Sequence, residues 1–501
     1  MRRHPSVLIV LAVLTAVQAC TGLWRTVIMY QEGLRAGVRP FAFSAGLVEE
    51  IGLSLCLAMV AWWWLPPHRW SWSRWGVHFL VFAWLIAIVQ LLWVLGMGFF
   101  EHGVSWATLL LLFVAGIFLR RRSGIELEPP PVRRLHFALV GGLFFWLLQL
   151  PHLFFPYHWT DTKDIWACRT AAFELRGSLT GIFDCLDPGR PPLHSIMLWL
   201  GHTNGFIEGR LLPFLLTGAF GLVLYRFLRR VAPSLAPWGV LWFFMTVRVY
   251  QGAVSNYADV PVMLAIAMGV FLAIDEKLVG SRWQAIAFAV VAGAAAALIK
   301  RDGGALIIVA TAVLWWLLPR RRDPRLYAAL GGAALGFALW NARPAHLETP
   351  SVFDIRIGQT ETPTLPIRLV SQVGVSNPAD SATVNIQTYL TMFYGMQGQM
   401  LSHYGFSMFV PLWIILAVWL WRRHERLDPE ARVFSWIALL GWLAIIGIYV
   451  LHVSTGHPYR GSLRVIRTAF GRHLVHMFVF ALLSAAAMAE LLVARARARS
   501  T

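Results

Sequence analysis

Long apolar stretches recur along almost the whole chain of 501 residues, and short runs rich in arginine separate them. A stretch of about 20 apolar residues can cross the hydrocarbon of a bilayer, roughly 30 Å thick, as one helix. Hydrophobic residues make up 58% of the chain and charged residues only 14%, whereas a soluble domain has about 25% charged residues. We therefore expect an all-α polytopic membrane protein with about 14 transmembrane helices.

The arginine clusters predict the orientation of these helices. The formal net charge of +18 would also suit a nucleic-acid partner, but the arginines lie between the apolar spans, as in cytoplasmic loops of membrane proteins. Six clusters fall on one side of the predicted bundle: Arg2–Arg3, Arg120–Arg122 with Arg133–Arg134, Arg229–Arg230, Arg320–Arg322, Arg422–Arg423 and the tail with Arg495, Arg497 and Arg499. We predict a multi-pass protein of a bacterial inner membrane with both termini in the cytoplasm, and no nucleic-acid partner.

The long hydrophilic segments all fall on the opposite, extracytoplasmic side. They are residues 156–207, 342–405 and 454–471, and long loops in compact proteins usually have a function. ATP and nucleotide sugars are not expected on that side. A transferase acting there would need an activated donor delivered from the membrane, such as a lipid-linked one.

The chain divides into two predicted units. Residues 1–122 contain four spans with little polar detail, and residues 123–132 form a proline-rich cytoplasmic linker. Residues 133–501 form a larger unit that carries all three long outer loops. The first of these loops is expected to hold two interfacial helices, at 165–176 and 193–201.

Two cysteines, Cys168 and Cys185, share the first outer loop. In an oxidising periplasm they could form a disulfide that closes a loop of moderate length. Two free thiols in an interfacial helix are the alternative. The sequence leaves both open.

Asp161 and Asp164 stand just before the first of these predicted helices. Their spacing suits a helix cap and an acidic first turn. It also suits a general base, because an acceptor hydroxyl that attacks a sugar must lose its proton to a nearby carboxylate. Further along, Arg190–Pro191–Pro192–Leu193–His194 forces an extended turn before the second helix. That turn is either a simple re-entry corner or part of a substrate loop.

The order of these features resembles the GT-C superfamily of membrane glycosyltransferases, which includes protein O-mannosyltransferases and lipid A aminoarabinose transferases. Relatives carry an Asp-Glu or similar acidic motif in the first outer loop and a His/Lys-Pro-Pro-Leu motif downstream. Here Asp161 is followed by Thr162, and Arg190 replaces the His or Lys. The segments 256–261 and 464–472 also look like family elements, and the resemblance covers roughly residues 133–493.

The resemblance implies a polyprenyl-phosphate sugar as donor and an acid in the first outer loop as catalytic base. Asp161 is the first choice for that base and Asp164 the second. Arg190, His194 and Asp259 match motif positions and would belong to the substrate loops.

Basic residues on the outer side are candidates for holding the donor phosphate. They are Lys300, Arg301, Arg464, Arg467 and Arg472. Lys300 and Arg301, with Asp302, are expected in a tight turn between two spans, and Arg248 is a weaker candidate. Arginine and lysine bind phosphate well, whereas ion pairing or contact with anionic headgroups is the alternative.

A metal or cofactor has little support in the sequence. His473 and His476 lie three residues apart and would share a helix face, but no carboxylate pattern accompanies them. Some relatives use a divalent ion. We expect no certain cofactor and interfacial or core histidines here.

The predicted function is therefore transfer of a hexose or pentose from a polyprenyl-phosphate donor to an extracytoplasmic lipid, glycan or protein, with inversion. The alternatives are a lipid or glycan transporter or flippase without covalent chemistry, and a non-catalytic scaffold of the same fold. The sequence identifies neither the sugar nor the acceptor.

Overall fold

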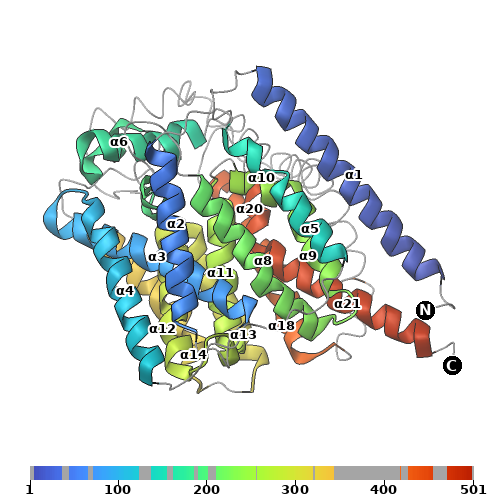
Figure 1. Ribbon diagram of the computed structural model, residues 1–501. Coiled ribbons are helices and arrows are strands. Elements are labelled where there is room, and N and C mark those ends of the chain that lie inside the picture. The colour runs from blue at the N-terminus through green and yellow to red at the C-terminus, as the bar shows by residue number, and fades with distance from the viewer. Residues whose placement is uncertain are drawn as a thin grey trace.

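The computed structural model describes residues 5–35, 45–65, 71–122, 137–154, 162–185, 190–200, 210–254, 257–319, 322–342, 418, 427–454 and 471–498. Within these residues the chain is helical and contains no β-strand. The longer helices pack into a bundle (Figure 1). The all-α prediction is confirmed for this part of the chain.

The helices before the middle of the chain are α1 (Pro5–Arg35), α2 (Ala45–Trp63), α3 (Trp72–Met97), α4 (His102–Arg122), α5 (Phe137–Leu147), α6 (Cys168–Arg176), α7 (Leu193–Trp199), α8 (Leu211–Val231), α9 (Ala236–Met245) and α10 (Val247–Val254). Those after it are α11 (Asp259–Ile274), α12 (Arg282–Ile299), α13 (Arg301–Leu317), α14 (Arg325–Asn341), α18 (Pro429–Ser454), α20 (Gly471–His473) and α21 (Phe478–Ala498). Short turns of 3₁₀-helix are η2 (Leu150–Phe154), η4 (Leu179–Asp184), η5 (Glu276–Leu278) and η10 (Leu474–Met477), and η3 (Thr162–Ala167) is a π-helix.

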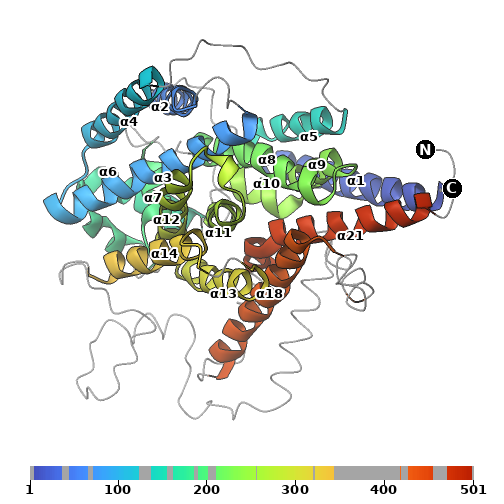
Figure 2. The ribbon, with the colours of Figure 1, turned by 90° about the horizontal axis from the view of Figure 1, so that it is seen from below.

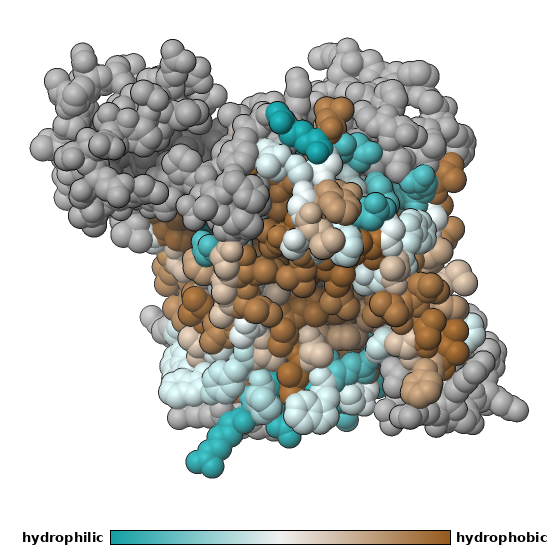
Figure 3. Space-filling model, turned by 90° about the vertical axis from the view of Figure 1, so that its left-hand side faces the viewer, coloured by the Kyte–Doolittle hydropathy of each residue, from teal (hydrophilic) through white to brown (hydrophobic). Residues whose placement is uncertain are grey.

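Six of the described helices are long and apolar enough to cross a membrane. They are Ala12–Gln31 within α1, Trp72–Met97, Leu211–Val231, Arg282–Ile299, Pro429–Tyr449 and Leu474–Arg495. Helices α10 and α11 meet at a bend of 111° and make a seventh if the pair counts as one span. On the face shown in Figure 3, a hydrophobic belt lies between two more hydrophilic edges. These features support association with a membrane.

Helix α11 is the central element of the bundle. Figure 2 shows it nearly end-on among α3, α12, α13, α14 and α8, and every residue from Asp259 to Ala273 is buried. A helix that is apolar all round can be stable only where other helices or lipid surround it. The acidic Asp259 at its first position is therefore enclosed by protein.

Helices α12 and α14 approach each other closely through glycines. A Cβ at Gly293 would overlap the carbonyl oxygen of Ala329, and one at Gly332 would overlap that of Val290. Small residues let helix backbones touch in a membrane, where lipid chains remove much of the hydrophobic drive for helix pairing. These contacts hold α12, whose last residue Ile299 precedes Lys300, against α14.

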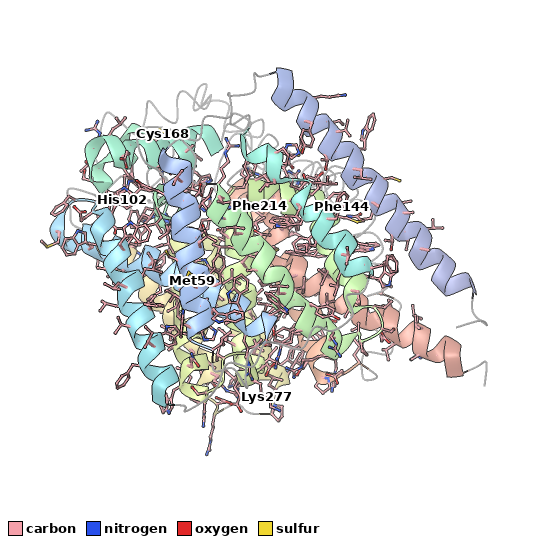
Figure 4. All side chains as sticks on the ribbon, viewed as in Figure 1. Met59, His102, Phe144, Cys168, Phe214 and Lys277 are labelled. Atoms are coloured by element: carbon pink, nitrogen blue, oxygen red, sulfur yellow. A yellow bond between two sulfur atoms is a disulfide. The ribbon has the colours of Figure 1, made fainter. Side chains whose placement is uncertain are left out.

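The two ends of the bundle differ in chemistry. Figure 4 shows Lys277 at one end and Cys168 at the other. At the Lys277 end, Asp275 Oδ2 lies 2.8 Å from Arg226 Nη2 and 2.9 Å from Arg230 Nη1, and Arg230 also pairs with Glu430. These pairs connect α8, the end of α11 and the start of α18. We call this face the basic end.

The predicted helices of the first outer loop are present, as α6 and α7. Helix α6 lies at the end of the bundle opposite the basic end (Figures 1 and 4), and Cys168 at its start forms a disulfide with Cys185. The sequence had left this pairing open. Helix α7 is fully buried, and Trp199 Nε1 donates a hydrogen bond of 2.7 Å to Glu174 Oε2.

The amino-terminal helices contact the remainder of the bundle. The ring of His102 stacks on Trp199 with centroids 4.0 Å apart. The buried carboxylate of Glu50 accepts a hydrogen bond of 3.0 Å from the backbone nitrogen of Leu212, in the first turn of α8. The predicted linker 123–132 lies outside the described residues. The amino end of α1 and the carboxyl end of α21 lie close together in both ribbon views (Figures 1 and 2).

Candidate functional site

Several predicted site residues lie outside the described part of the chain. The side chains of Asp161 and Asp164 are among them, although the backbone of Asp164 belongs to the π-helix η3. Arg464 and Arg467 and almost the whole segment 342–405 are also outside it. The roles predicted for these residues remain predictions.

Asp259, Lys300 and His476 meet in the interior. Lys300 Nζ donates a hydrogen bond of 2.6 Å to Asp259 Oδ1. His476 Nε2 lies 3.1 Å from the same oxygen. All three residues are buried. Sequence positions up to 217 residues apart thus converge on one carboxylate.

Asp302 extends this group into a cluster of four. Its Oδ2 lies 3.4 Å from His476 Nδ1 and 3.8 Å from Lys300 Nζ. His476 therefore stands between two carboxylates, with one ring nitrogen facing each. We refer to Asp259, Lys300, Asp302 and His476 as the ion cluster.

Local structure explains how each element presents its residue. Lys300 has an extended backbone, with φ −150° and ψ 142°, and is the single residue between α12 and α13. The tight turn predicted at 300–302 is therefore present. Gly303 sits against the carbonyl oxygen of Ala296, and a Cβ there would overlap it. His476 lies in the 3₁₀ turn η10 just before α21.

The ion cluster lies at the end of the bundle opposite the basic end. Asp259 is the first residue of α11, and the Asp275 that pairs with Arg226 directly follows the last residue of that helix. Its 16 residues span about 24 Å at 1.5 Å per residue. The cluster is therefore at the disulfide end, where the sequence predicts the extracytoplasmic side.

Further cations gather around the ion cluster. The guanidinium of Arg472 lies over the ring of Tyr257, 4.7 Å from its centroid. Arg248 is within electrostatic range of Arg472, Asp259 and Arg25, and its Nε has no hydrogen-bond partner among the described residues. Lys300, Arg472 and Arg248 thus lie within electrostatic range of Asp259. A group of described cations of this kind suits an anionic ligand.

Tyr449 and His473 border the cluster. The Tyr449 hydroxyl lies 2.8 Å from His473 Nδ1, and the rings of His473 and His476 stack with centroids 5.5 Å apart. Arg190, Arg472 and both carboxylates lie within electrostatic range of Tyr449. Arg190 and the ion cluster therefore share one region.

Arg190 and His194 are both held against Trp166. The Arg190 guanidinium lies 5.8 Å from the centroid of the Trp166 ring, and the His194 ring lies 5.2 Å from it. The fully buried Arg169 donates a hydrogen bond of 3.0 Å from Nη1 to the backbone oxygen of Arg190. The disulfide joins the start of α6 to Cys185, which follows η4. The turn 190–194 is thereby fixed by buried contacts.

The structure brings together some predicted site residues and leaves others apart. Asp259, Lys300 and Arg472 meet at the cluster, and Arg190 approaches it. Arg301 begins α13 next to Lys300. His194 is buried against Trp166. The chain between residues 5 and 498, where described, contains no group of three or more His, Cys, Asp or Glu side chains that could hold a metal ion.

Sequence reasoning missed the partners of Asp259. The spacing of His473 and His476 predicts a shared helix face, but it does not predict a contact of His476 with a carboxylate on α11 or α13. Arg25 was not among the predicted site residues. The chain matches no protein-family model, no curated protein and no solved structure.

Proposed function

We propose that this chain is a membrane glycosyltransferase of GT-C type. It transfers a sugar from a polyprenyl-phosphate donor to an extracytoplasmic acceptor and inverts the anomeric carbon. The observation that carries the proposal is the buried, positively charged region around the ion cluster. A phosphate that is still attached to an apolar lipid chain would suit a cationic site enclosed by apolar helices.

The proposed orientation follows from the two ends of the bundle. The basic end, with Arg226, Arg230 and Lys277, would face the cytoplasm. The end with the Cys168–Cys185 disulfide would face an oxidising compartment. The neighbouring positions of the start of α1 and the end of α21 support termini on the same side. We propose about 14 spans in a bacterial inner membrane, with α6 and α7 at the outer interface.

In the proposed reaction an acceptor hydroxyl attacks the anomeric carbon of the donor. Asp161 takes the hydroxyl proton as the new C–O bond forms, with Asp164 as the second candidate. The bond from the anomeric carbon to the phosphate oxygen breaks at the same time, and polyprenyl phosphate leaves. Lys300, Arg301, Arg464, Arg467 and Arg472 would stabilise the negative charge that develops on it.

Within the ion cluster, Asp259 would hold the ammonium of Lys300 in position by accepting one of its hydrogen bonds. An ammonium has three donors, and one of them is held by Asp259. The remaining donors could reach a phosphate while Asp259 and His476 fix the position of the nitrogen. Arg190, His194 and the segment 342–405 would shape the site for the acceptor.

The second candidate function is a transporter or flippase of lipid-linked sugars. It is favoured by the bend of 111° between α10 and α11, because transporters often bind substrate at the ends of broken helices. Asp259 at the start of α11 lies at such a break. A non-catalytic scaffold would have the same cluster but no turnover.

The test is transfer by the purified chain in proteoliposomes that contain a radiolabelled polyprenyl-phosphate sugar and an envelope extract as acceptor. The Asp161→Asn variant should lose at least about 100-fold in kcat, because general bases contribute about 10² to 10⁴. Arg472→Gln should raise the donor KM about ten-fold, for one charge-assisted contact worth about 1.4 kcal/mol. Asp428→Asn, at the start of α18 near the basic end, is the matched control and should behave as the unchanged chain.

Three outcomes would count against the proposal. Unchanged transfer by Asp161→Asn would remove Asp161 as the base, and unchanged transfer by Asp164→Asn as well would remove that loop as the catalytic site. Movement of the labelled lipid across the bilayer without release of polyprenyl phosphate would establish the transporter instead.

A further inference from the structure

A cavity of about 300 Å³ lies at the basic end, away from the ion cluster. It is lined by Arg74 on α3, Glu276 and Lys277 on η5, and Gly280, Ser281 and Arg282 at the start of α12. Figure 4 shows Lys277 at this end of the bundle. Neither the proposed transfer reaction nor the sequence motifs make use of this cavity.

Positive charge dominates the cavity wall. Three of its lining side chains are cationic and one is acidic. The acidic one, Glu276, has its Oε2 3.0 Å from Nη1 of Arg325, which does not line the cavity. The exposed ammonium of Lys277 is in no ion pair with a described carboxylate. Arg282 is exposed and its Nη2 lies 3.5 Å from Asp323 Oδ1. The wall therefore offers an anion the ammonium of Lys277 with the exposed guanidinium of Arg282 beside it.

Hydrogen bonds hold the wall in shape. Arg74 Nε donates a hydrogen bond of 2.8 Å to the backbone oxygen of Lys277, which fixes η5 against α3. Gln284 Nε2 lies 3.1 Å from His78 Nε2 and connects α12 to α3. Gly280 has φ +99°, a conformation that favours glycine. The turn it makes lets Ser281 cap α12 by accepting a hydrogen bond from Gln284 N.

The starts of two predicted spans meet beside this cavity. Both α3 and α12 begin there and run into the apolar belt as candidate membrane spans. Trp72 and Trp283, in the first turns of these helices, are 58% and 79% exposed. Exposed tryptophans are typical of the level where hydrocarbon meets lipid headgroups. A cavity beside two such tryptophans would lie at the depth of a phospholipid phosphate.

We propose that this cavity binds the phosphate headgroup of an anionic phospholipid from the cytoplasmic leaflet. Lys277 and Arg282 would contact the phosphate, and Arg74 would set the position of Lys277 through its hydrogen bond to the backbone. The first backbone N–H groups of α12 add favourable partial charge. The acyl chains would follow the apolar surfaces that begin at Trp72 and Trp283.

The test is titration of the full chain, purified in a mild non-ionic detergent, with phosphatidylglycerol and with phosphatidylcholine, read out by native mass spectrometry. A lysine or arginine near anionic lipid contributes about five-fold in affinity. The double variant Lys277→Gln/Arg282→Gln should therefore weaken phosphatidylglycerol binding about 25-fold. The double variant Arg229→Gln/Arg322→Gln removes two other exposed arginines outside the cavity, and it should bind like the unchanged chain.

Folding is checked by the melting temperature, which neither pair of exposed substitutions should lower. The charge reversal Lys277→Glu gives an independent reading and should weaken binding at least as much as the double variant. Equal affinity of the double variant and the unchanged chain would overturn the proposal. So would equal affinity for the two lipids, or displacement of phosphatidylglycerol by an equal concentration of inorganic phosphate, which would establish a soluble-anion site. The readout is lipid binding, so it is independent of sugar transfer.

Discussion

The two ends of the bundle both contain acidic and basic side chains, but they arrange them differently. At the basic end Asp275 receives two arginines and its Oδ1 also accepts a hydrogen bond of 3.0 Å from Lys277 N. At the other end Asp259 receives Lys300 and His476 in the interior, and Arg248 Nε beside them has no hydrogen-bond partner among the described residues. Asp275 therefore has partners on both oxygens, whereas Arg248 beside Asp259 has a donor without a partner among the described residues.

This difference separates a structural role from a functional one. Ion pairs near the surface connect helix ends and contribute modestly to stability. A buried cluster with spare donors is costly in folding unless another group completes it. We therefore assign helix positioning to the ion pairs of Asp275 at the basic end, and propose binding of the donor phosphate for the ion cluster.

Lys300→Met should have the largest effect on stability. It leaves the buried carboxylate of Asp259 without its lysine, and breaking a buried pair in this way costs about 3 to 5 kcal/mol. The free energy of unfolding is measured by titration with SDS. The double variant Asp259→Leu/Lys300→Met removes both charges and should recover most of the loss. If Asp259→Leu/Lys300→Met were as unstable as Lys300→Met alone, the loss could not be attributed to the unpaired charge of Asp259.

Arg230→Gln should cost only about 1 kcal/mol in the same titration, as expected for a pair near the surface. Asp275 keeps Arg226, whose Nε and Nη2 lie 3.0 Å and 2.8 Å from its Oδ2. Arg229→Gln, next to it in α8 and exposed, is the control and should be neutral. A loss as large as that of Lys300→Met would remove the contrast between the two ends.

Asp323 gives the smallest effect and one that depends on pH. Hydrogen bonds from the side chain of Arg325, at 2.9 Å and 2.6 Å, lower the pKa of the Asp323 carboxyl below its usual value of 3.8. Because this carboxyl has a lower pKa in the folded chain than in the unfolded chain, its negative charge stabilises the folded state above about pH 4. The stabilisation is lost as the pH falls through the pKa of the folded chain.

The matching measurement compares melting temperatures at pH 6 and pH 3. Asp323→Asn should be less stable than the unchanged chain at pH 6, by about 1 kcal/mol at most, and the difference should be smaller at pH 3. A difference that stays constant with pH would show that the carboxylate charge is not involved.

Much of the fold was predictable because membranes impose strong rules. Apolar length and the arginine clusters indicated a helical membrane protein, and the described helices agree. The short helices at 165–176 and 193–201 were predicted from prolines and apolar residues, and α6 and α7 lie there. The tight turn at Lys300 followed from the shortness of the segment between two apolar stretches. The number of spans was less predictable, since several apolar stretches are only marginally long.

The candidate site was only partly predictable. Asp259 was singled out by its motif position, and Lys300 and Arg472 as basic residues on the side predicted to be extracytoplasmic. That these residues lie together, and that His476 contacts both Asp259 and Asp302, could not be read from the chain. Each belongs to a different helix end, and sequence spacing says nothing about which ends are neighbours.

The class of protein, most of the helices and the residues with unusual charge could be predicted from the chain, because they depend on local composition and on the cost of placing charge in a bilayer. The pairing of Lys300 with Asp259, the disulfide between Cys168 and Cys185, and the cavity beside Lys277 became visible only in the folded molecule. The disulfide depends on how α6 lies against η4, and the pairing and the cavity depend on how α3, α11 and α12 pack. That packing is set by close contacts such as Gly293 against Ala329, which have no signature in any single segment.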